Sequence, residues 1–386
     1  MLARMLLITA TALGSMALPA CAQTGDAGRE TDASRVARMI GHGDSWATDF
    51  SKISVRPEEI VSGGPPKDGI PAIDAPKFEA AETANRWLAD REPVLVVEHG
   101  GVVKGYPLQI LIWHEIVNDE VGGRPLTATF CPLCNTALVF ERRLGDRILD
   151  FGTTGRLRHS DLIMYDRQTE TWWQQASGEA IVGEWVGTLL DYYPANTLSW
   201  ERARSLYPQI RVLSRDTGYD RAYGRNPYTG YDTGAGPIGA FFTGEPDPRY
   251  PAMERVVGVQ IGGGWAVAFS ELEAARVVNA ETDGVAFVVL WAPGAASALD
   301  QGSIPDGRDV GQSATYRRAL GDRTLTFEWT DGAFRDRETG SSWDLAGRSV
   351  AGPLEGERLE AVPHGNHFWF AWITFKTESE IWLPDR

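Results

Sequence analysis

The chain has 386 residues, of which 43% are hydrophobic and 23% are charged. This balance is typical of soluble globular proteins and excludes a polytopic membrane protein or a disordered chain. The formal charge of −15 at pH 7 excludes nucleic acid as a partner, because phosphate binding requires clustered Lys and Arg. The length suits two domains of ordinary size.

Residues 1–22 predict an export signal, in which Arg4 precedes an apolar run from residue 6 to residue 19. The run is too short to span a membrane. Residues 20–22 fit the A-x-A cleavage rule, whereas residues 18–21 resemble a lipobox in which Cys21 is lipidated. We therefore expect an exported protein, either periplasmic or a membrane-anchored lipoprotein whose lipid is its sole membrane contact.

Residues 23–92 form an N-terminal extension with loop chemistry, as in GGPPKDGIPAID. After it the chain resembles itself, because an offset of about 161 residues aligns 101–138 with 262–299 without a gap. This pattern predicts two tandem, degenerate copies of one unit. We name residues 93–214 the first lobe and residues 255–386 the second lobe; a Gly-, Tyr- and Pro-rich connector, 215–254, joins them.

Each lobe is predicted to be mainly β with a few short helices. In the first lobe, residues 93–107 read as strand, Gly-Gly turn, strand, and residues 137–151 as a hairpin closed near Gly145. Helices are expected over 108–118 and 199–208.

Four residue positions of the first lobe are lost in the second. His114, Cys131 and Cys134 align with alanines, and His159 lies in a six-residue excess with no counterpart. Residues that maintain a fold should survive in both lobes, so this loss favours a chemical role, although drift of ordinary core or surface residues explains it too. Pro132 persists, which predicts that both lobes keep the turn.

The stretch Cys-Pro-Leu-Cys-Asn is typical of metal-binding knuckles, in which the residue after the second cysteine is left-handed, as Asn135 tolerates. A closed tetrahedral site needs two more ligands, and His114 and His159 would complete a Cys2His2 set. Thiolates favour zinc, copper or iron, and export makes copper or zinc the better expectation. A redox-active or structural disulfide, or inert thiols, are the alternatives.

Two carboxylates that do not recur, Glu115 and Asp161, are expected to orient these histidines as outer partners. Asp166 recurs as Asp336 and is therefore expected to be structural. His364 and His367 are further metal candidates, if one of them reaches the first-lobe site across the lobe interface.

The 14 tryptophans admit two interpretations. Exposed tryptophans at residues 172–173 and 369–372 would bind glycan or peptide, whereas recurrence of Trp173 and Trp200 in the second lobe favours core positions. No G-x-S-x-G motif supports a serine hydrolase.

The stretches KDGIPAID, YPLQILIWHEIVND, FCPLCNTALVF, FGTTGRLRHSDLIMYDRQTETWWQQ, RNPYTGYD and FWFAW resemble the bacterial DUF3179 family. The resemblance implies an envelope protein and no activity. From the residues we expect an exported metalloprotein with one Cys/His site, with metal-dependent redox chemistry on a small molecule as the enzymatic option. The alternative is a binding module with a disulfide and a Trp-rich surface.

Overall fold

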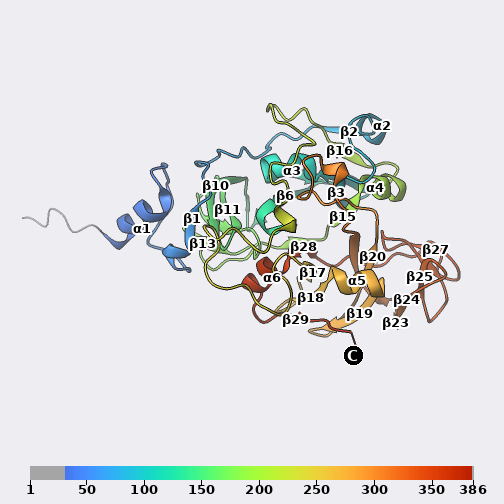
Figure 1. The fold of residues 1–386 in the computed structure, drawn as a ribbon. Helices are drawn as coiled ribbons and strands as arrows, with labels where there is room; N and C mark the ends of the chain where they lie inside the picture. Colours follow the sequence, from blue (N-terminus) through green and yellow to red (C-terminus); the bar gives the residue numbers. More distant parts are fainter. Residues whose placement is uncertain (1–30, 385–386) are drawn as a thin grey trace, which may run out of the picture.

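The computed structural model describes residues 31–384, so the export signal and Cys21 lie outside the described part. The described chain is mainly β with short helices, which confirms the predicted fold class. Figure 1 shows the first lobe in blue-green to yellow-green beside the second in gold to red. None of the helices in residues 31–384 has the length and apolar character that crossing a membrane demands.

The N-terminal extension is built into the first lobe. Its strands β1 and β2 pair with β10 and β16 of that lobe, and so extend two of its sheets. The buried Arg156 anchors the end of α1 by donating to the carbonyls of Ile40 and Gly41 at 2.8 and 2.7 Å. The elements are α1 (Asp32–Gly41), η1 (Pro57–Glu59), β1 (Ile60–Ser62), β2 (Phe78–Ala80) and α2 (Ala81–Ala84).

The first lobe contains three larger sheets, with strand orders β15-β3-β4-β16-β2, β14-β7-β6-β5 and β1-β10-β11-β12-β13, and the two-stranded sheet β8-β9. All pairings are antiparallel except β16 with β4. The elements are β3 (Pro93–His99), β4 (Val102–Pro107), α3 (Leu108–His114), β5 (Ile116–Val121), β6 (Arg124–Cys131), η2 (Pro132–Cys134), β7 (Thr136–Glu141), β8 (Arg143–Leu144), β9 (Arg147–Ile148), β10 (Phe151–Arg158), β11 (Asp161–Asp166), β12 (Trp172–Gln174), β13 (Ala180–Val182), β14 (Tyr192–Tyr193), β15 (Asn196–Ser199), α4 (Trp200–Leu206) and β16 (Arg211–Leu213).

The second lobe repeats these pairings in sheets of order β28-β17-β18-β29, β19-β20-β21 and β24-β25-β26-β27. Its one parallel pair, β18 with β29, corresponds to β4 with β16. The elements are β17 (Arg255–Val259), β18 (Trp265–Ala268), α5 (Phe269–Ala275), β19 (Val277–Thr282), β20 (Val285–Ala292), η4 (Ile304–Asp306), β21 (Gln312–Arg317), β22 (Ala319–Leu320), β23 (Arg323–Thr324), β24 (Phe327–Thr330), β25 (Ala333–Asp336), β26 (Ser342–Trp343), β27 (Ser349–Ala351), β28 (His364–Phe368), α6 (Trp369–Phe375) and β29 (Glu380–Ile381).

The recurrence of topology agrees with the predicted internal repeat, while descent by duplication stays our interpretation. One expectation about the repeat was wrong. In the first lobe Cys131 pairs with Thr136 across a short turn, whereas in the second lobe Ala292 pairs with Gln312. The intervening residues 293–311 form a long loop with η4, so Pro293 does not preserve the turn of Pro132.

The first predicted helix is also shorter than expected, since α3 ends at His114 and not at residue 118. Glu115 takes φ +60°, which breaks the helix, and the β-branched Ile116 and Val117 begin β5. The helix near residue 199 is confirmed as α4, with Ser199 as its N-cap accepting from the Arg202 amide. The turn at Gly145 is confirmed, but its hairpin is limited to β8 and β9, because residues 136–141 form β7 and pair with β6 instead.

The lobes contact each other through two equivalent strand pairs, β15 with β21 and β28 with β7. At the first, Asn196 donates to the Tyr316 hydroxyl at 3.1 Å. At the second, the Thr136 hydroxyl and His367 Nδ1 are hydrogen-bonded at 2.9 Å.

The connector packs its aromatic residues, among them Tyr228 and Tyr231, against the first-lobe core. It contains η3 (Tyr231–Thr233). It is fixed to the second lobe by the buried Asp232, which pairs with Arg255 at 2.6 Å and Arg308 at 2.9 Å. The connector is therefore an ordered cover for the first lobe.

The predicted core role of the tryptophans is supported by their burial, because Trp172, Trp173, Trp200, Trp369 and Trp372 are among the largest fully buried side chains. Within residues 31–384, Trp329 is the sole tryptophan classed as exposed, at 42%. The residues expected to form a Trp-rich binding surface are therefore inside the protein.

Candidate metal centre

The two cysteines lie at the end of β6 and in the turn η2 that follows it. Asn135 ends this turn with φ +51° and ψ +31°, which confirms the predicted left-handed conformation. Its amide donates to the Pro132 carbonyl at 3.2 Å. This tight turn aims both thiols to the same side, and both are buried, at 1% and 0% exposure.

The hairpin β10–β11 brings a carboxylate to these thiols. Its two-residue turn, His159-Ser160, has φ +52° and +67°, a type of turn in which glycine or asparagine is usual. The Ser160 carbonyl accepts a long hydrogen bond from the Cys131 thiol, with 3.6 Å between Sγ and O. The next residue, Asp161, is fully buried.

Asp161 forms a compact group with the cysteines. One carboxylate oxygen and the two Sγ atoms all lie within 4.8 Å of one another. Oδ1 accepts hydrogen bonds from Gln174 Nε2 at 2.6 Å and the Ala176 amide at 2.9 Å, whereas Oδ2 is buried without a well-directed donor. The thiols contact this carboxylate only loosely, so one buried oxygen lacks a strong partner.

Every acidic group here is biased toward its protonated form. Burial raises the pKa of Asp161 to about 6, against the lowering effect of its hydrogen bonds. Burial raises the pKa of the Cys131 thiol and, to a greater extent, that of Cys134. Because the charged forms are desolvated, the group exists as thiols and a partly protonated carboxyl unless a cation is bound.

Glu115 is also buried and, although it is not a member of this group, its charge acts on that of Cys131. It caps α3 with a positive φ, and its carbonyl accepts from the Phe130 amide at 2.8 Å. Burial, followed by the charge of Asp161, raises the pKa of Glu115 to about 8. Arg276 occupies the equivalent position of the second lobe with the same helix-ending geometry, φ +64°, so the turn is shared and the carboxylate is not.

The two histidines predicted as ligands are not members of the Cys131–Cys134–Asp161 group. His114 Nδ1 donates to the Pro71 carbonyl at 2.7 Å, so its Nε2 accepts from the Tyr223 hydroxyl at 2.6 Å. Burial lowers the pKa of His114, consistent with this neutral form. His159 sits in the strained turn and contacts Thr243 at 3.0 Å and Glu59 at 3.6 Å.

Of the two further candidates, His367 does cross the lobe interface. It contacts Thr136, whose hydroxyl also lies 3.2 Å from the Cys134 carbonyl. Its Nε2 is buried without a partner, and burial lowers its pKa to about 3. His364 contacts the Val362 carbonyl at 2.9 Å, and neither histidine belongs to the thiol–carboxylate group.

Tyrosines of the connector lie over the group. The Tyr231 hydroxyl donates to the Leu133 carbonyl at 3.0 Å, in the middle of the cysteine turn. Burial raises the pKa of Tyr228, with Glu115 and Cys131 as smaller causes, and that of Tyr231, with the two cysteines as smaller causes. The site is therefore enclosed by neutral phenols.

This geometry suits cation binding better than thiol chemistry. A reactive cysteine needs an exposed, low-pKa thiolate, and both thiols here are buried with raised pKa values. The cysteines are also free in this structure, which gives the predicted disulfide no support. Sequence reasoning placed Asp161 as an outer partner of the histidines, whereas the structure places its carboxylate beside the two sulfur atoms.

Comparison with known proteins adds a family. A family model described as a protein of unknown function (DUF3179) matches residues 67–379. No curated protein and no solved structure matches the chain.

Proposed function

Because the chain belongs to the DUF3179 family of proteins of unknown function, we propose its function from the buried site alone. The protein is an exported metalloprotein of the cell envelope that binds one transition-metal ion through Cys131, Cys134 and Asp161. Glu115, a buried carboxylate outside that group whose charge acts on Cys131 and Asp161, is our candidate for a fourth ligand. In this proposal the Asp161 carboxylate is a direct ligand, in place of the imidazoles expected from the sequence.

The observation that carries the proposal is the gathering of the ligand atoms of Cys131, Cys134 and Asp161 within 4.8 Å of one another in the protein interior. Burying a carboxylate oxygen without a strong donor costs on the order of 1–3 kcal/mol, and Asp161 Oδ2 is such an atom. A bound cation would displace the protons of the thiols and carboxyls and satisfy that oxygen. Inert packing gives no reason for two thiols and a carboxylate to meet here.

The mixed ligand set favours zinc. Zn²⁺ accepts both thiolate and carboxylate, with bonds of about 2.3 Å to sulfur and about 2.0–2.2 Å to oxygen. Copper(I) prefers sulfur and imidazole, so the Asp161 carboxylate makes it a poorer match. Ligand atoms in a tetrahedral zinc site are about 3.5–3.8 Å apart, which small side-chain rotations would reach from the present spacing.

The enclosure of the site supports a structural or storage role before a catalytic one. A catalytic metal keeps an open coordination position for substrate, whereas the connector tyrosines cover this site. Metal-dependent redox chemistry would require the connector to move away.

The test is elemental analysis of protein purified from the periplasm of an expressing bacterium. We expect near-stoichiometric zinc, lost in Cys131→Ser/Cys134→Ser. Cys21→Ser is the matched control, because it removes the third cysteine and leaves the site intact. It should retain zinc and, if Cys21 is lipidated, release the protein from the membrane fraction.

The rival function is a metal-free binding module whose cysteines form a disulfide. Its signature is protein without metal and without titratable thiols after unfolding. That result would overturn the proposal, since a disulfide cannot ligate the ion.

A further inference from the structure

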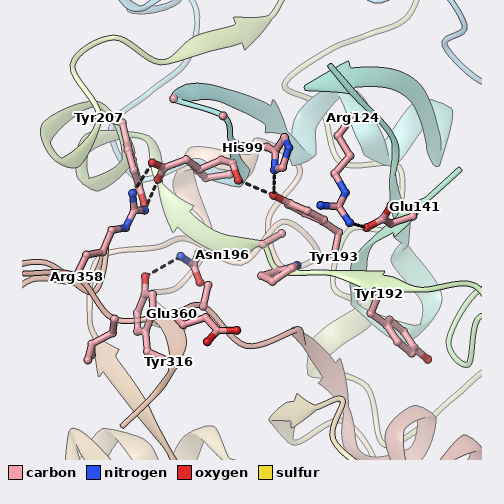
Figure 2. A pocket seen from close by; sticks show the side chains of 18 residues that line it. His99, Arg124, Glu141, Tyr192, Tyr193, Asn196, Tyr207, Tyr316, Arg358 and Glu360 are labelled. Carbon is pink, nitrogen blue, oxygen red and sulfur yellow. Dashed lines mark hydrogen bonds and ion pairs between the residues drawn. The ribbon is translucent and has the colours of Figure 1, made fainter. Parts of the chain in front are cut away.

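A groove of about 560 Å³ lies at the lobe interface, separate from the thiol–carboxylate group. Its volume falls within the range of small-molecule sites, about 300–1,000 Å³. Figure 2 shows its labelled side chains arranged around the opening, with Arg124, Glu141 and Tyr193 from the first lobe facing Tyr316, Arg358 and Glu360 from the second.

The charges that line the groove are compensated within the protein. Arg358 forms a two-pronged ion pair with Glu98, and Arg124 pairs with Glu141. Glu360, at the rim, pairs with Arg317 at 3.3 Å. An anionic or cationic ligand would have to break one of these pairs, so the groove favours a neutral ligand.

Two chains of hydrogen bonds each leave one acceptor atom in the groove wall without a protein partner. The Tyr193 hydroxyl donates to the Glu98 carbonyl at 2.9 Å, so it must accept from His99 Nδ1, also at 2.9 Å. With Nδ1 used in this way, His99 Nε2 is the ring nitrogen left for a ligand, since it has no protein partner in residues 31–384.

The second chain follows the same logic. The Tyr316 hydroxyl donates to the Leu345 carbonyl at 2.8 Å and accepts from Asn196 Nδ2 at 3.1 Å. The orientation of the Asn196 amide is thereby fixed, and its Oδ1 has no partner in the described part of the chain. Both atoms can accept from a ligand's hydroxyl groups.

The groove also offers aromatic surface and donors. The Tyr193 ring carries the Arg124 guanidinium over one face, with 5.3 Å from the guanidinium carbon to the ring centroid. That guanidinium uses one of its terminal nitrogens for Glu141, which leaves further N–H groups for a ligand.

We propose that this groove binds a short neutral oligosaccharide. A sugar hydroxyl can donate to His99 Nε2 or Asn196 Oδ1 and can also accept from the Arg124 guanidinium. The apolar face of a sugar ring packs on tyrosine. The volume holds on the order of two or three hexose rings. This site is distinct from the buried tryptophans that the sequence suggested for glycan binding.

The test is calorimetric titration of the purified full chain with three neutral trisaccharides: maltotriose, cellotriose and chitotriose. We expect at least one to bind in the micromolar to millimolar range. Tyr193→Ala should weaken that binding about tenfold or more, and His99→Ala and Asn196→Ala each about fivefold. Tyr193→Phe should weaken it less than Tyr193→Ala, because the ring remains.

Trp329→Ala is the matched control, an exposed aromatic outside the groove, and should not change the affinity. Thermal melting of each variant checks that it is folded. Absence of binding by all three sugars at 10 mM overturns the proposal, as does binding of trialanine alone or equal weakening by Trp329→Ala. Cys131→Ser/Cys134→Ser should bind sugar normally, so this proposal and the metal proposal fail separately.

Discussion

The two lobes share a framework, and the thiol–carboxylate group exists in one of them. The hairpin β10–β11 spans residues 151–166, whereas its counterpart β24–β25 spans residues 327–336 and closes through the ordinary Asp331-Gly332 turn. The longer hairpin places Asp161 beside the cysteine turn. The second lobe has the shorter hairpin and, in place of the cysteine turn, the long loop of residues 293–311, so a similar sheet framework occurs without the site.

The shared framework includes a matched hydrogen-bond motif. Asp166 accepts from Trp173 Nε1 at 2.9 Å and the Thr169 amide at 2.7 Å. Asp336 accepts from Trp343 and Thr339 at the same two distances. This confirms that Asp166 is a structural residue, as its recurrence predicted.

The largest effect is expected at this motif. Asp166→Ala and Asp336→Ala each leave a buried indole N–H and a backbone amide without an acceptor, so each should lower the free energy of unfolding by about 2–4 kcal/mol. Urea unfolding measures it. If the two substitutions lowered the free energy of unfolding by widely different amounts, the motif would not have an equivalent role in the two lobes.

Asp161→Asn should lower the affinity for zinc without lowering the stability of the fold. Asparagine keeps an acceptor for the Ala176 amide and loses the charge, so zinc affinity should fall about 10–100-fold with little change in unfolding. Asp331→Asn, at the turn of the shorter hairpin, is the control and should leave affinity unchanged. Competition for zinc with a chelator of known affinity measures the zinc affinity of each variant.

The lobes also differ at β28, where His367 stands at the position of Leu198 in β15. The pKa of His367 is about 3 in the folded chain, against an ordinary value of 6.5. The unfolded chain therefore binds more protons between these pH values, and stability, complete above pH 6.5, falls as pH drops toward 3. His367→Leu should reduce the loss of unfolding free energy between pH 7.5 and pH 5 by about 2 kcal/mol. An unchanged pH profile would mean that His367 is hydrated.

The smallest effect concerns the two hairpin turns. Ser160 has a left-handed backbone, and its hydroxyl is buried without a partner, so Ser160→Gly should stabilise the chain by about 1 kcal/mol. Gly332 also has a left-handed backbone conformation, and a Cβ added at this position would have no other atom within 4 Å. Gly332→Ser should therefore destabilise by a similar amount through backbone strain alone. Thermal melting compares the two.

Local features of the fold were predictable because neighbouring residues determine them. Asn135 indicated the left-handed end of the cysteine turn, and the Gly-Gly and Gly145 turns marked their hairpins. The first helix was predicted too long because Glu115, which ends it, has no obvious helix-breaking character in sequence.

The site was half predictable. Comparison of the lobes identified the cysteines and the non-recurring Asp161, but the partners of each histidine depend on residues far away in sequence. His114 is engaged by Pro71 and Tyr223, and His159 by Glu59 and Thr243. Hairpin length and register decide such contacts, and neither is encoded in residue spacing.

X-ray absorption at the zinc edge tests the central claim most directly, because it counts the sulfur and oxygen neighbours of the bound ion. The proposed centre predicts two sulfur atoms at about 2.3 Å and oxygen atoms at about 2.0–2.2 Å, with the sulfur shell lost in Cys131→Ser/Cys134→Ser. A zinc shell of nitrogen and oxygen without sulfur in the unaltered protein would contradict it.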